Sequence, residues 1–211
     1  MESDNKALRG LAIIRANLWP YIVINILYYG LVLCGMTVEA LYPAARDRLL
    51  ASHQVPVHAN SVLDAAAKVY QSKNIPLAAL VTFLVNSIIG AFASITLPSA
   101  LIPFSGFVVG LCRPAVWGIW FSSTRSQVTM LPRLLVLLIE GQAYILAIFG
   151  SYLWGRWVIH PTKSGFGTRK AGYRAGLRTN MQLYSLILAT LAVSAIYEAV
   201  EVIGAMPPTS H

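Results

Sequence analysis

The sequence predicts an all-α integral membrane protein, namely a polytopic bundle of about five transmembrane helices with short amphipathic helices at the membrane surface. Of its 211 residues, 56% are hydrophobic and only 11% are charged, whereas a soluble domain carries roughly 25% charged residues. The mean hydropathy is +0.62, and several apolar runs reach the roughly 20 residues that a helix needs to cross the hydrocarbon core. These observations exclude an ordinary soluble domain and indicate one membrane domain over residues 1–211.

Five apolar segments are predicted to cross the membrane as helices. They cover residues 18–43, 76–97, 98–120, 132–158 and 181–204. Only the stretch TLPSALIP separates the second span from the third. Its two prolines favour a tight hairpin, with a partly re-entrant pair of helices as the alternative.

Two further segments are predicted to form amphipathic helices at the membrane surfaces. Residues 1–17 alternate basic and apolar side chains at helical spacing, as a helix on the cytoplasmic surface does. In the predicted external loop, residues 44–75, Ser61 and Asp64 have the spacing of a capping box. An apolar face follows that cap, formed by Val62, Ala66, Val69 and Tyr70.

Most of the net charge of +8 lies at membrane edges. The loop predicted over residues 159–180 contains no acid and five basic side chains, namely Lys163, Arg169, Lys170, Arg174 and Arg178. Basic loops remain on the cytoplasmic side, which places the N-terminus inside and the C-terminus outside the cytoplasmic (inner) membrane of a prokaryote. We expect anionic lipids as additional partners of this loop. Because the charge lies at a membrane edge, we do not expect a nucleic acid partner.

Small residues mark the faces where helices are predicted to pack closely, because lipid offers no hydrophobic gain for bundling. In the second span Asn86, Gly90 and Ser94 recur every four residues, and in the third Gly106 and Gly110 form a G-x-x-x-G pair. In the last span the small residues share one side, formed by Ser185, Ala189, Ala192 and Ala199. A packing role for these stripes is preferred over a pore lining.

The charged residues inside the spans are the candidate functional residues. Glu140 lies about 12 Å below the outer end of the fourth span, and Arg113 lies roughly 10 Å below the same surface. An ionised side chain at the bilayer centre costs on the order of 3 kcal/mol, so we expect Arg113 and Glu140 to pair and Glu140 to face the bundle interior. The carboxylate could fix helix register, handle protons or ions, or contact a partner subunit. Glu39, Glu198 and Glu201 lie nearer the outer surface.

No motif in the sequence predicts an enzyme. The four histidines have no metal-site spacing with cysteines or acids, and no G-x-S-x-G, P-loop or dinucleotide fingerprint occurs. We therefore expect neither a catalytic residue nor a metal or other cofactor.

The order of features resembles the stage II sporulation protein M family over residues 20–205. The stretches FLVNSIIGAFASITLPSALIPFSGFVVG, LLIEGQAYILAIFGSYLWG and AIYEAVEVIG carry this resemblance. It implies that Asn86, Gly106, Gly141 and Glu198 match residues of the family pattern. The chain departs from that pattern in two places: it has Ser105 before the third-span glycine, and it lacks the histidine of the fourth-span motif. The resemblance implies a membrane scaffold that holds partner proteins.

Two functions from different classes follow from these observations. The first is a non-catalytic scaffold or subunit that assembles with other membrane proteins, as hetero- or homo-oligomer. The alternative is a small transporter, channel or permease subunit that uses an intramembrane polar cluster of Glu140, Arg113, Asn86 and Glu198.

Overall fold

The computed structural model of the chain describes residues 2–42, 44, 62–122 and 130–206. Within these residues every regular element is helical, which confirms the all-α part of the predicted fold class. The elements are α1 (Glu2–Ala16), α2 (Leu18–Leu41), α4 (Val62–Gln71), α5 (Ile75–Leu84), the π-helix η1 (Val85–Thr96), α6 (Leu97–Leu101), α7 (Ser105–Ser122), α8 (Met130–Ile159), the short 3₁₀ helix η2 (Thr162–Ser164) and α9 (Arg169–Gly204). The predicted helix in the external loop is α4, but Ser61 of its capping box lies outside the described residues.

Among the described residues, four helices are long and apolar enough to cross a membrane. They are Leu18–Leu41, the continuous helix Ile75–Leu101 made of α5, η1 and α6, Pro132–Ile159 of α8, and Arg169–Gly204. The apolar part of α7, Ser105–Ile119, is shorter. The sequence predicted about five spans, and four of them meet this length.

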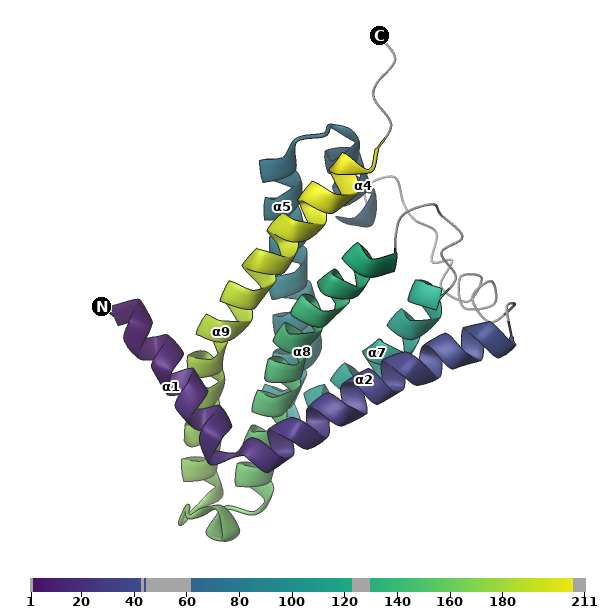
Figure 1. Cartoon of the computed structure of the whole chain (residues 1–211). Coiled ribbons are helices and arrows are strands. Elements are labelled where there is room, and N and C mark those ends of the chain that lie inside the picture. The colour runs from purple at the N-terminus through teal and green to yellow at the C-terminus, as the bar shows by residue number, and fades with distance from the viewer. Residues whose placement is uncertain (1, 43, 45–61, 123–129, 207–211) are drawn as a thin grey trace.

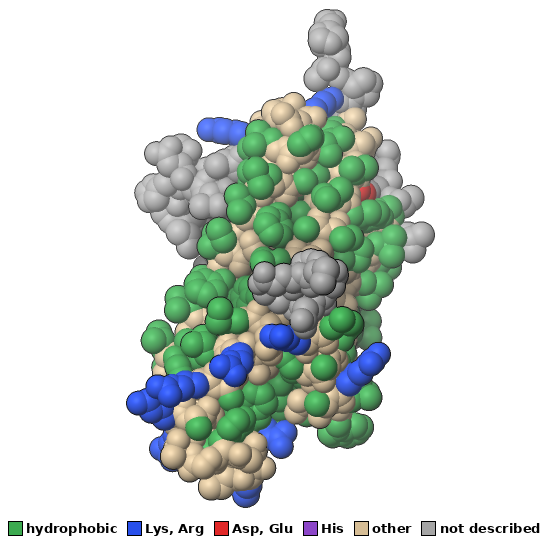
Figure 2. Space-filling model, turned by 90° about the vertical axis from the view of Figure 1, so that its left-hand side faces the viewer, with side chains coloured by type: hydrophobic (Ala, Val, Ile, Leu, Met, Phe, Trp, Pro, Cys, Tyr) green, Lys and Arg blue, Asp and Glu red, His purple; other side chains and the backbone are tan. Residues whose placement is uncertain are grey.

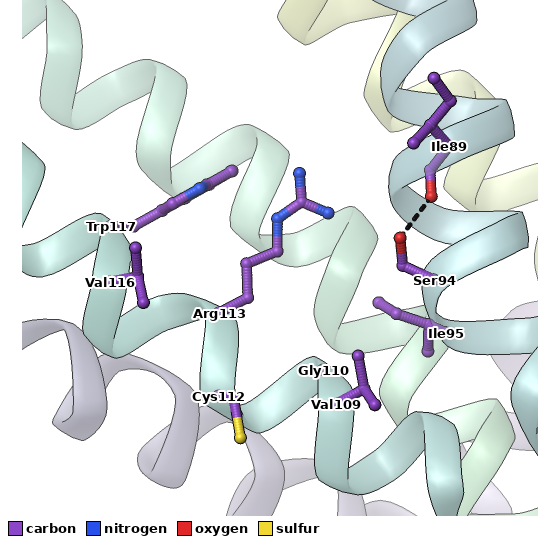
Figure 3. A pocket seen from close by; sticks show the side chains of 9 residues that line it. All are labelled: Ile89, Ser94, Ile95, Val109, Gly110, Cys112, Arg113, Val116 and Trp117. Carbon is purple, nitrogen blue, oxygen red and sulfur yellow. Dashed lines mark hydrogen bonds between the residues drawn. The ribbon is translucent and has the colours of Figure 1, made fainter. Parts of the chain in front are cut away.

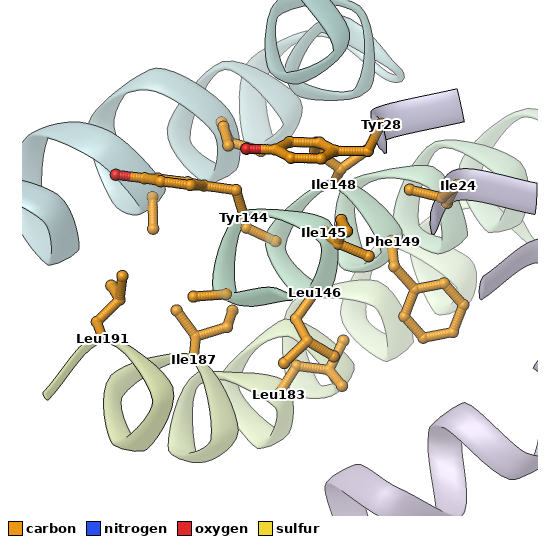
Figure 4. Packing of buried hydrophobic residues seen from close by; sticks show 14 of the residues in the cluster. Ile24, Tyr28, Tyr144, Ile145, Leu146, Ile148, Phe149, Leu183, Ile187 and Leu191 are labelled. Atoms are coloured by element: carbon orange, nitrogen blue, oxygen red, sulfur yellow. The ribbon is translucent and has the colours of Figure 1, made fainter. Parts of the chain in front are cut away.

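Helix α8 lies at the centre of the bundle (Figure 1). In its apolar window 72% of the residues are buried, against 22–28% in the other three long helices. On one side α8 packs against α9, which also contacts α5, and on the other it packs against α2 and α7. The buried cluster around α8 includes Tyr144, Ile148 and Phe149, with Tyr28 from α2 and Leu183 from α9 (Figure 4).

Two glycines let α2 and α7 cross at backbone contact. A Cβ atom on Gly35 would overlap the carbonyl group of Ala115, and a Cβ atom on Gly118 would overlap the carbonyl group of Val32. Contact of this kind provides the van der Waals surface that holds helices together in lipid. Neither glycine belongs to the stripes predicted from the sequence.

The turn between the second and third apolar segments lies later than the sequence predicted. The helix runs through Pro98 to Leu101, and the chain reverses at Ile102–Phe104, where Phe104 has a φ of 67°. Pro98 lies inside this continuous helix, two residues after the π-helix η1 ends, and its nitrogen donates no hydrogen bond to the preceding turn. The Ser99 hydroxyl then accepts a hydrogen bond of 2.9 Å from the Gly106 N–H, which closes the hairpin.

The packing face of α9 differs from the predicted side of small residues. Ala189 is exposed, and the buried face consists of Gly172, Gly176, Thr179, Asn180, Leu183, Ile187, Leu191, Ser194, Ala195 and Ala199. The physical reason is that α8 presents large rings and branched side chains here, so α9 fits them with glycines near its start and with leucine and isoleucine further along. For example, the indole ring of Trp154 fills the space where Gly176 lacks a side chain.

The predicted basic loop is a loop only as far as Thr168. The Thr168 hydroxyl accepts a hydrogen bond of 3.2 Å from the Ala171 N–H and caps α9, so four of the five predicted basic residues lie on this helix. All five are exposed. On the face of the molecule drawn in Figure 2, most of the Lys and Arg side chains gather in the lower part. The N-terminal helix α1 packs against α9, where Gly10 faces Leu186.

We predict that Gly35→Ala lowers the free energy of unfolding by about 1–3 kcal/mol, because the added Cβ overpacks the α2–α7 crossing. The matched control on the same helix is Gly30→Ala, since no atom lies within 4 Å of the Cβ position at Gly30. Alanine favours a helix over glycine by roughly 1 kcal/mol, so this control should be as stable as the wild type or more stable. Thermal unfolding in nanodiscs measures both variants, and equal stabilities would contradict the close crossing.

Candidate functional site

A cluster of buried polar side chains surrounds the middle of α8. Glu140 is only 5% exposed, and Tyr144 lies one turn further along the same helix. Tyr28 comes from α2 and Arg113 from α7. These four residues form the polar cluster of the structure. It contains Tyr28 and Tyr144 in place of Asn86 and Glu198 of the cluster predicted from the sequence. In Figure 4 the rings of Tyr28 and Tyr144 lie side by side, with both hydroxyl groups pointing in the same direction.

Arg113 contacts aromatic faces and a backbone carbonyl. Its guanidinium carbon lies 4.4 Å from the ring centroid of Tyr144 and 5.2 Å from that of Trp117. One guanidinium N–H donates a long hydrogen bond of 3.5 Å to the Gly90 carbonyl. Cation–π contacts of this kind contribute about 2 kcal/mol where water is excluded.

Arg113 and Glu140 share Tyr144 as a neighbour instead of forming a direct ion pair. The Tyr144 hydroxyl lies next to the Glu140 carboxylate, although not in hydrogen-bonding geometry, while the Tyr144 ring lies against the guanidinium. Both charged residues belong to the described part of the chain, and no salt bridge joins them there. The expected pair is therefore an electrostatic coupling across a tyrosine.

The π-helix η1 brings backbone close to these charges. Within it, the Ser94 hydroxyl donates 2.6 Å to the Ile89 carbonyl, and the Thr96 hydroxyl donates 3.2 Å to the Ala91 carbonyl. Both bonds span five residues, which is the π-helical register. A Cβ atom on Gly90 would lie 2.5 Å from the Tyr144 hydroxyl and 3.2 Å from an Arg113 nitrogen. Gly90 therefore lets both side chains reach this helix.

Several buried hydroxyl groups have no hydrogen-bond partner within the described residues. They include those of Tyr28, Tyr144, Ser151 and Ser194. Buried polar groups in proteins are nearly always hydrogen-bonded to protein or to ordered water. The polar cluster thus offers several donors and acceptors to water or to a small polar ligand.

The other predicted residues surround the polar cluster at different distances. Glu198 is half-buried on α9 and interacts electrostatically with Glu140 and Glu201. Asn86 is half-buried about one turn from Gly90, and within the described residues its side chain makes no hydrogen bond. A Cβ atom on Gly141 would lie 3.2 Å from a ring carbon of Tyr28 and 3.2 Å from the Tyr29 hydroxyl, both on α2.

Helix α4 packs against α5 and α9 near the carboxylates of this region. The Tyr70 hydroxyl lies 2.7 Å from the Thr82 hydroxyl of α5. Burial raises the pKa of Tyr70 to about 12, with smaller contributions from the nearby carboxylates that include Glu198. The hydrogen bond from Thr82 acts in the opposite direction. Helix α4 therefore packs onto the ends of α5 and α9.

A second polar network, which sequence reasoning missed, joins α2 to α8 through Gln142. The Gln142 amide nitrogen donates 2.9 Å to the Asn25 side-chain oxygen and 2.9 Å to the Tyr29 hydroxyl, and the amide oxygen accepts 2.8 Å from the Tyr21 hydroxyl. The Tyr29 hydroxyl donates onward to the Leu138 carbonyl at 3.2 Å. Both donors and an acceptor of the amide are satisfied. The signal in the sequence is the four-residue spacing of Tyr21, Asn25 and Tyr29, which places them on one helix face.

A groove of about 440 Å³ lies between η1 and α7. Arg113 reaches into it from α7 (Figure 3). Its lining is otherwise mostly apolar and consists of Ile89, Ser94, Ile95, Val109, Gly110, Cys112, Val116 and Trp117. Pro114 follows Arg113 inside α7, so the Gly110 carbonyl lacks its helical N–H partner. Gly110 also faces Ile148 of α8, while Gly106 lies against the Ile95 carbonyl of η1.

No family model matches the chain, and no match was found among curated proteins or solved structures. Within the described residues, no three His, Cys, Asp or Glu side chains come together as a metal site would require.

We predict that Arg113→Leu destabilises the bundle more than the double change Arg113→Leu with Glu140→Gln, because the double variant leaves no buried charge without its opposite. The coupling free energy should fall within about 0.5–3 kcal/mol. Unfolding free energies in nanodiscs measure it, with Arg178→Leu replacing Arg113→Leu as the exposed control, which should be additive with Glu140→Gln. If the Arg113–Glu140 double variant loses the sum of the two single losses, the charges act independently.

Proposed function

We propose that this chain is a non-catalytic membrane scaffold, a subunit that assembles with other membrane proteins. The observation that carries the proposal is the fixed arrangement around α8. The α2–α7 crossing admits no Cβ atom at Gly35 or Gly118, and the Gln142 network leaves no amide donor unused. A bundle locked in this way is suited to holding partners in a set geometry.

The proposed topology has five spans: the four long apolar helices and α7, which is the third span in chain order. The N-terminus lies inside and the C-terminus outside the cytoplasmic membrane of a prokaryote, and α1 lies at the cytoplasmic surface. The exposed basic residues at the start of α9 support this orientation, because basic segments remain on the cytoplasmic side. The same side chains are the proposed contact for anionic lipids. The resemblance to the stage II sporulation protein M family supports the scaffold role.

The scaffold proposal predicts that the chain leaves its native membrane in a complex. Native mass spectrometry after mild solubilisation should detect it bound to at least one other membrane protein chain, or to further copies of itself. Crosslinking in the intact membrane before solubilisation serves as the control for complexes lost in detergent. A chain that is monomeric in both measurements would overturn the proposal.

The unpartnered hydroxyl groups of the polar cluster support a second candidate, a transporter, channel or permease subunit. A water-filled path past Glu140 would satisfy these hydroxyls. It predicts proton or cation flux in proteoliposomes that falls about tenfold or more in Glu140→Gln, with bilayer insertion intact. Glu201→Gln is the control, since that carboxylate lies near the end of α9. Wild-type protein that moves neither protons nor alkali cations would remove this candidate.

A further inference from the structure

We propose that the groove between η1 and α7 binds a transmembrane helix of a partner protein, and that this helix carries a carboxylate at mid-membrane depth that pairs with Arg113. The inference rests on the proposed scaffold function and on α7 as a membrane span. It names the chemistry by which the partner is recognised.

The groove has the shape and chemistry of a helix-binding surface. Its walls are the apolar side chains of two neighbouring helices, and a lining residue of each is exposed: Ile89 by 46% on η1 and Val109 by 46% on α7. Gly110 and Ser94 are small residues of the lining, so they leave room for a helix in the groove. An apolar helix packs into such a surface through side chains spaced three and four residues apart.

Arg113 has hydrogen-bonding capacity that the described part of the chain does not use. A guanidinium carries five N–H donors in a planar fork that fits a carboxylate. Within the described residues Arg113 makes one hydrogen bond, the 3.5 Å contact with the Gly90 carbonyl. The aromatic faces of Tyr144 and Trp117 contact the positive charge, but they do not accept two parallel N–H hydrogen bonds as a carboxylate does. A carboxylate entering along the groove would complete this coordination.

The depth of Arg113 favours a protein partner over a lipid headgroup. Arg113 lies eight residues after Ser105 and nine before Ser122, so about 12–14 Å of helix separates it from either end of α7. Lipid phosphates lie outside a hydrocarbon core of about 30 Å. The aromatic contacts hold the guanidinium at this depth instead of letting it extend toward the surface. An acidic side chain on a transmembrane helix reaches the same level.

A second copy of this chain does not supply the carboxylate from its described residues. Glu140 lies at a comparable depth but is only 5% exposed within its own bundle. Glu39 and Glu201 lie within a turn of their helix ends, and Glu198 lies about one turn further in. The partner is therefore a different protein.

The test uses the full chain in nanodiscs with synthetic 21-residue Leu/Ala helices as probes. The helices carry a single central Glu, Gln or Leu and a cysteine one turn away. Cys112 is exposed beside Arg113 and serves as the reporter, in a Cys34→Ser background that removes the other cysteine. The Glu helix should form the disulfide with Cys112 about tenfold or more above the Leu helix, with Gln in between.

Two variants separate a charge interaction from general packing. Arg113→Gln should remove the preference for Glu over Gln, whereas Arg113→Lys should retain part of it because the charge remains. Val109→Trp fills the groove from an exposed position and should reduce crosslinking of all three helices. Arg178→Gln, at the exposed basic end, should leave the preference unchanged.

Equal crosslinking of the Glu, Gln and Leu helices would overturn the inference, as would a preference for Glu that survives in Arg113→Gln. Loss of the Glu preference when phosphatidylglycerol replaces zwitterionic lipid would assign the groove to a lipid headgroup and also overturn it. If the probe helices show no Glu preference but native mass spectrometry detects a complex, the scaffold function stands and the interface lies elsewhere on the chain. Helix binding through Arg113 by a chain that is monomeric in its native membrane would support the groove and remove the scaffold function.

Discussion

Polar groups in hydrocarbon must find their partners inside the protein, and this constraint organises the whole structure around α8. In lipid the helices gain no hydrophobic free energy by packing together, so contact area and hydrogen bonds hold the bundle. Helix α8 provides both. Gln142 binds three side chains of α2, and Asn180 of α9 donates hydrogen bonds to the Gly150 carbonyl of α8 at 3.2 Å and to its own helix at 3.0 Å. These hydrogen bonds fix the register of α2 and α9 against α8.

The two polar regions of α8 differ in how completely they are satisfied. The Gln142 network is closed, with each donor matched to an acceptor. Two residues before and two residues after Gln142, about half a turn away, Glu140 and Tyr144 lie on the side of Arg113, and within the described residues the Tyr144 hydroxyl has no hydrogen-bond partner. Closed networks favour a unique packing, whereas groups with remaining capacity mark places where water or a ligand interacts. The functional proposals therefore centre on Arg113 and Glu140.

The sequence predicts the helices well and their contacts only in part. Hydropathy located α2, α8 and α9, because a span must be apolar over about 20 residues. The hairpin after η1 begins later than the predicted boundary at residues 97–98, because the helix continues through Pro98 to Leu101 although the prolines in TLPSALIP resemble a break. Gly35 and Gly118 carry no recognisable spacing, and their pairing arises only when α2 and α7 cross. The burial of Glu140 was predictable, but its separation from Arg113 by an aromatic ring was not.

The start of α9 has a thermodynamic consequence for the membrane surface. A helix N-terminus carries partial positive charge, yet the first turn of α9 contains Arg169 and Lys170 and no acid. These like charges oppose the helical state of the first turn, which the Thr168 cap only partly offsets. Any anionic surface that binds these cations also stabilises the helix end. Local helix formation and surface attachment are thus linked equilibria: rising ionic strength weakens the attachment, while it also screens the repulsion that opposes the first turn.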